Sequence, residues 1–97
     1  MDANTINRAI IAGIQDSAIP KVDREKILAT FGDAEGNALA DKVSELVHEA
    51  ASMPVDWGDM TLRQGVEDIL GRFRERHPDL SPEALHEIGR CVGWQLR

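Results

Sequence analysis

The feature that most constrains this fold is a helical spacing of apolar residues between positions 62 and 73. Its members occupy positions i, i+4, i+7, i+8 and i+11, which places their side chains on one face of an α-helix. They are Leu62, Val66, Ile69, Leu70 and Phe73. Thr61 and Gln64 form a capping-box pattern at the start of the segment, and Pro78 ends it. Such a helix has to bury its apolar face, so the rest of the chain must supply elements that cover it.

Three segments before this one show helical features. The first is capped by Asn4 or Thr5, and Pro20 either ends it or opens the next helix. The second runs from about Val22 to Phe31, with Gly32 as its stop. The third is capped by Asp33 and continues to the Met53-Pro54 pair, carrying a long apolar face. We therefore predict helices over all three segments.

A last helix has the clearest start signal of the chain. Ser81 occupies the cap position and Pro82 the first helical position, while Leu80 and Leu85 have the spacing of a hydrophobic staple. Only a few residues separate this helix from the one before it, so the two are expected to form an antiparallel αα-hairpin.

These segments predict one all-α domain over residues 1–97, built as a small irregular bundle of four to five helices. Residues 53–60 contain Pro, Gly and two Asp and are predicted to form a loop. No segment shows the sustained alternation of a β-strand. The only aromatic residues are Phe31, Trp57, Phe73 and Trp94, so the core must consist of Leu, Ile, Val and Ala.

Negative charge is concentrated in one part of the sequence. The chain has a formal net charge of −6, and residues 33–59 hold seven acids against Lys42 alone. Acids and bases balance in residues 60–97. A field of this sign repels phosphate backbones and anionic membranes and attracts basic proteins. We therefore expect no direct nucleic-acid partner and no membrane partner.

The single cysteine and the amino-terminal residues favour a reducing compartment. Cys91 has no second cysteine with which to form an intrachain disulfide. The start, Met-Asp-Ala-Asn, lacks the basic region of a secretion signal, and the longest nearly apolar run, from Ala9 to Ile14, is too short to span a membrane. These features predict a cytoplasmic protein.

One pattern of residues suggests a metal-dependent enzyme, and helical geometry disfavours it. Glu45 with His48 and Glu83 with His86 repeat a Glu-x-x-His spacing that di-iron bundles use. At 100° per residue, however, His48 lies about 180° from the core residue Leu39. The second pair also points away from its apolar face. Cys91 is expected to be a small core or boundary residue. We therefore predict no metal, no cofactor and no enzymatic activity.

The candidate binding surface is an acidic stripe that continues into the predicted loop. Asp41, Glu45 and Glu49 recur every four residues on the face opposite the core, and His48 lies beside them. In the loop, Trp57 lies between Asp56 and Asp59. Aromatic anchors with acidic neighbours suit a basic protein partner.

Two interpretations of each tryptophan remain open. Trp57 either contacts a partner or folds back as a lid on the bundle. Trp94 either packs against the amino-terminal helix, which is favoured, or lies exposed and stacks on an arginine.

The last part of the chain resembles a known family. Residues 79–85, Asp-Leu-Ser-Pro-Glu-Ala-Leu, lead into a helix that ends in Gly-Trp-Gln-Leu-Arg at residues 93–97. This ending is similar to that of small bacterial immunity proteins of the colicin D-like and contact-dependent growth-inhibition types. The resemblance implies a cytoplasmic antidote that binds a toxin domain, often a nuclease, and blocks its active site.

Two hypotheses of function follow from the sequence. In the first, the chain is an immunity protein that occludes the basic cleft of a cognate toxin with Asp41, Glu45, His48, Glu49, Asp56, Trp57 and Asp59. In the second, it is a helical adaptor or regulatory subunit that assembles through an apolar face, including assembly as a homodimer.

Overall fold

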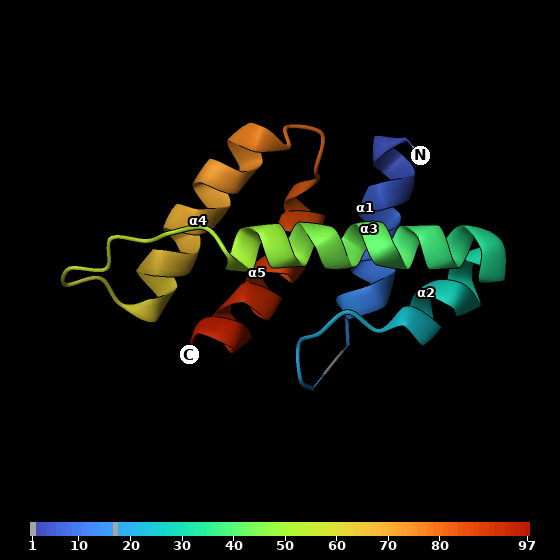
Figure 1. Cartoon of the computed structure of the whole chain (residues 1–97), viewed down its shortest axis with the longest axis horizontal. Coiled ribbons are helices and arrows are strands. Elements are labelled where there is room, and N and C mark those ends of the chain that lie inside the picture. The colour runs from blue at the N-terminus through green and yellow to red at the C-terminus, as the bar shows by residue number, and fades with distance from the viewer. Residues whose placement is uncertain (1, 17) are drawn as a thin grey trace.

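The computed structural model describes residues 2–16 and 18–97, and over these residues the chain forms five α-helices and no strand. In chain order they are α1 (Ala3–Ile14), α2 (Arg24–Phe31), α3 (Asp33–Ala51), α4 (Leu62–Arg76) and α5 (Pro82–Leu96) (Figure 1). α4 and α5 run in opposite directions and pack against each other. The predicted all-α class and the carboxy-terminal helical hairpin are confirmed.

The longest helix, α3, organises the fold. It packs against α1, α2, α4 and α5, and α5 also packs against α1 and α4. The molecule measures 45 × 27 × 18 Å, and α3 lies along its long direction (Figure 1). α2 covers the first part of α3 at one end, and the loop between α3 and α4 projects at the other.

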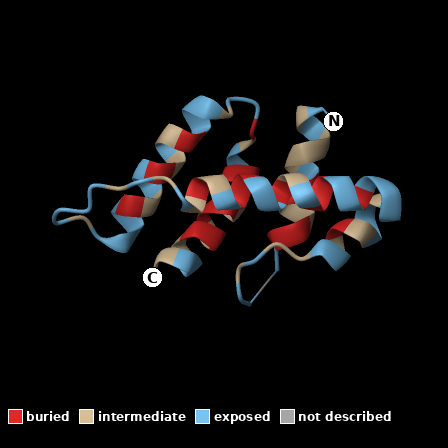
Figure 2. Cartoon of the chain, viewed as in Figure 1, coloured by how far each residue is buried: buried red, intermediate tan, exposed pale blue. Residues whose placement is uncertain are grey.

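All five helices contribute buried side chains to the core. Its largest fully buried side chains are aliphatic except for one aromatic ring, and they are Phe73, Ile10, Ile14, Ile27, Leu39, Ile69 and Ile88. Figure 2 shows these buried stretches on the inner sides of the helices, whereas the loop after α3 has no buried residue. No polar or charged side chain is buried among residues 2–16 and 18–97. Apolar burial at about 1.5–3 kcal/mol per large side chain therefore stabilises the fold.

The second half of the chain has the helix starts that the sequence predicts. Thr61 Oγ1 accepts a hydrogen bond from Gln64 N at 3.2 Å, and Gln64 Oε1 accepts one from Thr61 N at 2.9 Å. Ser81 Oγ accepts a hydrogen bond from Ala84 N at 3.1 Å. Leu80 and Leu85 are both buried. The capping box and the serine cap are confirmed, and both residues of the predicted staple lie in the core.

In the first half, several predicted boundaries are wrong. Asp2, not Asn4 or Thr5, caps α1, because its carboxylate accepts a hydrogen bond from Thr5 N at 2.8 Å. The helix ends at Ile14, well before Pro20, and position 17 lies outside the described residues.

The boundaries of the next two helices also differ from the predictions. Asp23 caps α2, which therefore begins at Arg24 and not at Val22. Gly32, at φ 86°, ends α2 as predicted and also precedes α3 directly, so Asp33 is the first helical residue and not the cap. The two helices share this junction because glycine adopts a positive φ without strain.

The start of α4 gives another correction. Leu62 was expected on the buried face, but it is 38% exposed. Residues 61–64 are all exposed and burial begins at Gly65, so the first turn of α4 extends past the core.

We expect Phe73→Ala to destabilise the protein by about 3–5 kcal/mol, because the ring is fully buried and its removal leaves a cavity. Leu62→Ala is the matched control and should cost less than about 1 kcal/mol, since this side chain is exposed. Urea unfolding followed by circular dichroism measures both. Equal losses from the two variants would contradict this description of the core.

Candidate functional site

The predicted surface residues lie on α3 and on the loop that follows it. Asp41, Glu45 and His48 are exposed and Glu49 is half-buried. In the loop, Asp56, Trp57 and Asp59 are exposed. The structure therefore keeps all seven away from the core, but it gives them different electrostatic surroundings.

Asp41 is paired within the molecule. Its Oδ1 accepts a hydrogen bond from Arg24 Nη2 at 2.6 Å, and Arg24 Nη1 also donates to Asn37 Oδ1 at 3.0 Å. The arginine comes from α2, which packs along the first part of α3. Both charged side chains are about half exposed or more, so the pair contributes at most about 1 kcal/mol. Its main effect is to offset the charge of Asp41.

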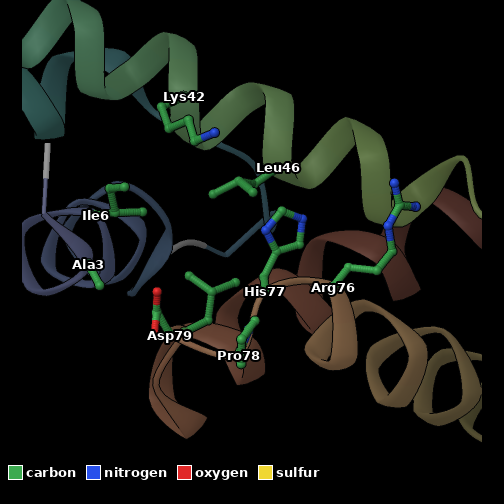
Figure 3. A pocket seen from close by; sticks show the side chains of 9 residues that line it. Ala3, Ile6, Lys42, Leu46, Arg76, His77, Pro78 and Asp79 are labelled. Atoms are coloured by element: carbon green, nitrogen blue, oxygen red, sulfur yellow. The ribbon is translucent and has the colours of Figure 1, made fainter.

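Glu49 is paired at the other end of α3. His77 Nε2 lies 2.8 Å from Glu49 Oε2, and Arg76 Nε lies 3.8 Å from the same oxygen. The imidazole ring is itself packed on Phe73, with ring centres 4.6 Å apart. Figure 3 shows His77 beneath Leu46, at the junction of α3 with the turn between α4 and α5. Glu49 therefore ties α3 to the end of α4.

The predicted continuous acidic stripe is interrupted as a result. Cationic side chains from α2 and from the end of α4 lie against Asp41 and Glu49, so these two carboxylates are partly neutralised within the molecule. Glu45 lies between these two pairs and has no ion pair or hydrogen bond from its side chain within the described chain. The stripe is one free carboxylate flanked by two partly neutralised ones.

The loop at residues 53–60 is fixed to α4. Arg72 Nη2 donates a hydrogen bond to the carbonyl oxygen of Pro54 at 2.6 Å, and Met60 N donates to that of Trp57 at 2.6 Å. The indole ring of Trp57 lies directly over Gly65, where a β-carbon would overlap it. Glycine at this position therefore provides the space in which the ring is held.

Trp57 folds back onto the bundle, as one of its two interpretations predicts, but it stays partly exposed. One side of its ring covers α4 at Gly65, as a lid does, and the residue is still 36% exposed. An aromatic side chain held in this way loses little conformational entropy when it contacts another protein.

Two free carboxylates flank this tryptophan at one end of the molecule. Asp56 and Asp59 are exposed, and among the described residues their side chains have no ion pair or hydrogen bond. Leu62 follows on the first turn of α4, one helical turn before Gly65. We call Asp56, Trp57, Asp59 and Leu62 the acidic tip, and Figure 1 shows its loop projecting beyond the helices. Leu62 was missed as a surface residue because its spacing matches the core.

Trp94 corrects another prediction. It was expected to pack against the amino-terminal helix, but it is 36% exposed and the Arg97 guanidinium carbon lies 3.4 Å from its ring centre. Val92 is buried in the last turns, and at 100° per residue Trp94 lies about 160° around α5 from it. The alternative of an exposed ring stacked on arginine is confirmed.

The two Glu-x-x-His pairs face solvent as the helical wheel predicts, since Glu45, His48, Glu83 and His86 are all exposed. Within residues 2–16 and 18–97, no group of three or more His, Cys, Asp or Glu side chains is close enough to hold a metal ion. The same residues contain no helix long and apolar enough to cross a bilayer.

Cys91 lies in the core and its thiol is fully buried. Burial raises the pKa of the Cys91 thiol from 9.0 to about 11, so it stays protonated at neutral pH. A protonated, inaccessible thiol is not a nucleophile. Its predicted place in the core is confirmed.

A hollow of about 260 Å³ lies where α1, α3 and the turn after α4 meet. Its floor is apolar and includes Ile6, Leu46 and Leu80, and Lys42 lies at its edge (Figure 3). The one base within residues 33–59 therefore lies beside this hollow.

No family model, no curated protein and no solved structure matches this chain.

The buried thiol predicts a pH dependence of stability. Between pH 9 and about 11 the unfolded chain releases the Cys91 proton while the folded chain retains it, so the free energy of unfolding falls as pH rises. The melting temperature of the wild type should therefore drop more between pH 8 and pH 11 than that of Cys91→Ala, which lacks the thiol. Circular dichroism measures both melting temperatures. If they fall equally between pH 8 and pH 11, the Cys91 thiol does not contribute to the pH dependence of stability.

Proposed function

We propose that this chain is an immunity protein that binds a cognate bacterial toxin domain and blocks its basic cleft. The observation that supports the proposal most strongly is the acidic tip, where two carboxylates without internal partners flank a fixed, partly exposed tryptophan. The resemblance of residues 79–97 to the endings of bacterial immunity proteins agrees with it. In this proposal the protein acts in the cytoplasm without a cofactor and catalyses no reaction.

Electrostatics favours a cationic partner. With a net charge of −6, the chain attracts basic surfaces over long distances, and such steering raises association rates at low salt. A nuclease that binds a polyanion needs a basic cleft, and carboxylates imitate the phosphates that the cleft normally binds. This complementarity is what an antidote requires, because it must capture the toxin before the toxin acts.

The acidic tip adds specific contacts to this general attraction. Trp57 offers a rigid aromatic edge, and Asp56 and Asp59 lie on both sides of it in the sequence. Glu45 and His48 extend the contact surface along α3. Asp41 and Glu49 contribute to the field but would have to give up internal ion pairs to bind a partner directly.

The test is binding to the toxin domain encoded by the gene adjacent to that of this chain, measured by isothermal titration calorimetry. We expect the double variant Asp56→Lys, Asp59→Lys to weaken binding by about tenfold to a thousandfold, because both free carboxylates become repulsive. The matched control is Glu75→Lys, Glu83→Lys, which changes net charge equally at exposed positions outside the acidic tip.

Two results would contradict the proposal. Equal losses in the two double variants would show that net charge alone governs binding, and that the acidic tip is not the contact surface. If excess wild-type chain leaves the activity of the toxin unchanged, the chain is not an inhibitor of that toxin.

One observation supports the adaptor hypothesis. Large apolar side chains are exposed at Ile19, Leu62 and Trp94. In that hypothesis the chain assembles through an apolar face. Light scattering of the chain without any partner distinguishes the two functions. A dimer that persists at high salt indicates assembly through an apolar face. The immunity proposal instead requires salt-sensitive binding to a basic protein.

A further inference from the structure

The segment that leads into the acidic tip is held against α4 at two points. Arg72 Nη2 donates a hydrogen bond to the carbonyl oxygen of Pro54 at 2.6 Å. Three residues further along the chain, the ring of Trp57 lies over Gly65. Gly65 and Arg72 are seven residues apart, so they lie on the same face of α4, separated by about 10 Å. Three extended residue steps also span about 10 Å, so residues 54–57 match the distance between the two points.

The side chain of Arg72 is itself oriented by the helix. Its Nη2 also donates to Asp68 Oδ2 at 2.9 Å, one helical turn earlier on the same face of α4. Its Nε atom is buried, so the guanidinium lies between the loop and the helix and not in open solvent. A planar guanidinium that is bonded on two sides has a fixed orientation. We call Arg72 and Asp68 the Arg72 clamp.

The exposed part of the acidic tip begins after the position that the Arg72 clamp holds. Asp56, Trp57 and Asp59 all follow this position in the chain and are exposed. The chain then reverses through Gly58, at φ 46°, and Met60 N donates to the carbonyl oxygen of Trp57 at 2.6 Å. Because this turn starts at Trp57, the direction of both carboxylates depends on where the tryptophan is held.

Other contacts of this segment are apolar and confined to its first part. Met53 and Val55 are half-buried and pack against the core. Residues 56–59 are all exposed, and apart from the ring of Trp57 over Gly65 they have no packing contact of this kind among the described residues. Loss of the Arg72 clamp is therefore expected to loosen the tip without releasing the whole loop.

We infer that the Arg72 clamp positions the acidic tip, keeping Trp57 and its neighbouring carboxylates in the conformation that a partner binds, although the clamp itself does not contact the partner. This inference rests on the proposed function, because it takes the acidic tip as the contact surface. A loosened tip adopts the binding conformation only part of the time, and the apparent affinity falls in proportion to that fraction. Arg72 is thus a positioning residue that acts on the free chain.

The test compares the tip of the free chain with its affinity for a partner. In chain labelled with 5-fluorotryptophan, ¹⁹F NMR gives a resonance for Trp57, which the variant Trp57→Phe identifies. Arg72→Ala should move part of this intensity to a second position, or shift the averaged resonance in fast exchange. Calorimetry with the toxin domain of the adjacent gene should show binding weakened by about tenfold, by the same factor as the populated fraction falls.

Two further variants separate position from charge. Arg72→Lys keeps the charge but lacks the fork of donors, so it should recover only part of the loss. Arg74→Ala is the matched control, because it removes the same charge from an exposed position on the same helix, and it should bind as the wild type does. Equal losses in Arg72→Ala and Arg74→Ala would show that charge is responsible and would overturn the inference.

Gly65 gives a second route to the same ring. A β-carbon at this position would lie 2.1 Å from Trp57 Cζ3, so Gly65→Ala must displace the tryptophan while the Arg72 clamp stays intact. Alanine favours a helix, so circular dichroism should show that the fold is retained. We expect a displaced ¹⁹F resonance and weaker toxin binding. Gly71→Ala is the control on the same helix, since its β-carbon would have no neighbour within 4 Å, and it should change neither.

The outcomes distinguish this inference from the proposed function. If the wild type does not bind the toxin domain, the proposed function fails and this inference fails with it. If the wild type binds and Arg72→Ala binds equally well, only the role of the Arg72 clamp is wrong. Wild-type affinity in Gly65→Ala, together with a displaced resonance of Trp57, would likewise show that the partner does not need the held conformation.

Discussion

Burial of the apolar face of α3 against α1, α2 and α5 is the interaction on which the rest of the structure depends. Leu39, Val43 and Ala50 are fully buried along this face, and they are spread over most of the length of α3. Because α3 is buried on one side along its length, its opposite side is fixed toward solvent. The same packing brings α2 and the end of α4 beside that exposed side, and it leaves the following loop at one end of the molecule.

In this arrangement, some carboxylates form ion pairs within the molecule and others remain available to a partner. Arg24 and the pair Arg76 and His77 reach the outer side of α3 from elements distant in sequence, and they partly neutralise Asp41 and Glu49. Asp56 and Asp59 in the acidic tip, by contrast, make no side-chain ion pair or hydrogen bond within the described part of the chain. A partner that meets the tip does not have to break an ion pair, so the cost of desolvation and rearrangement is lower there than along α3.

Close helix packing determines where the acidic tip lies. Gly65 lets the ring of Trp57 rest on one side of α4, and Gly89 lets Leu70 approach α5 on another. Gly71 faces solvent without such a contact, beside the free side chain of Arg74. The acidic tip thus lies at the start of α4, on the side of this helix that carries Gly65.

The sequence by itself determined the features that depend on neighbours a few residues away. The capping box at Thr61, the serine cap at Ser81, the glycine stop at Gly32 and the all-α class all follow from local hydrogen bonds and apolar spacing. Only the tertiary structure decided that Glu49 meets His77, that Leu62 lies beyond the core, and that Trp94 faces solvent. These outcomes depend on how far each helix extends past its neighbours and on which distant residues pack beside it, and helical periodicity contains no information about either.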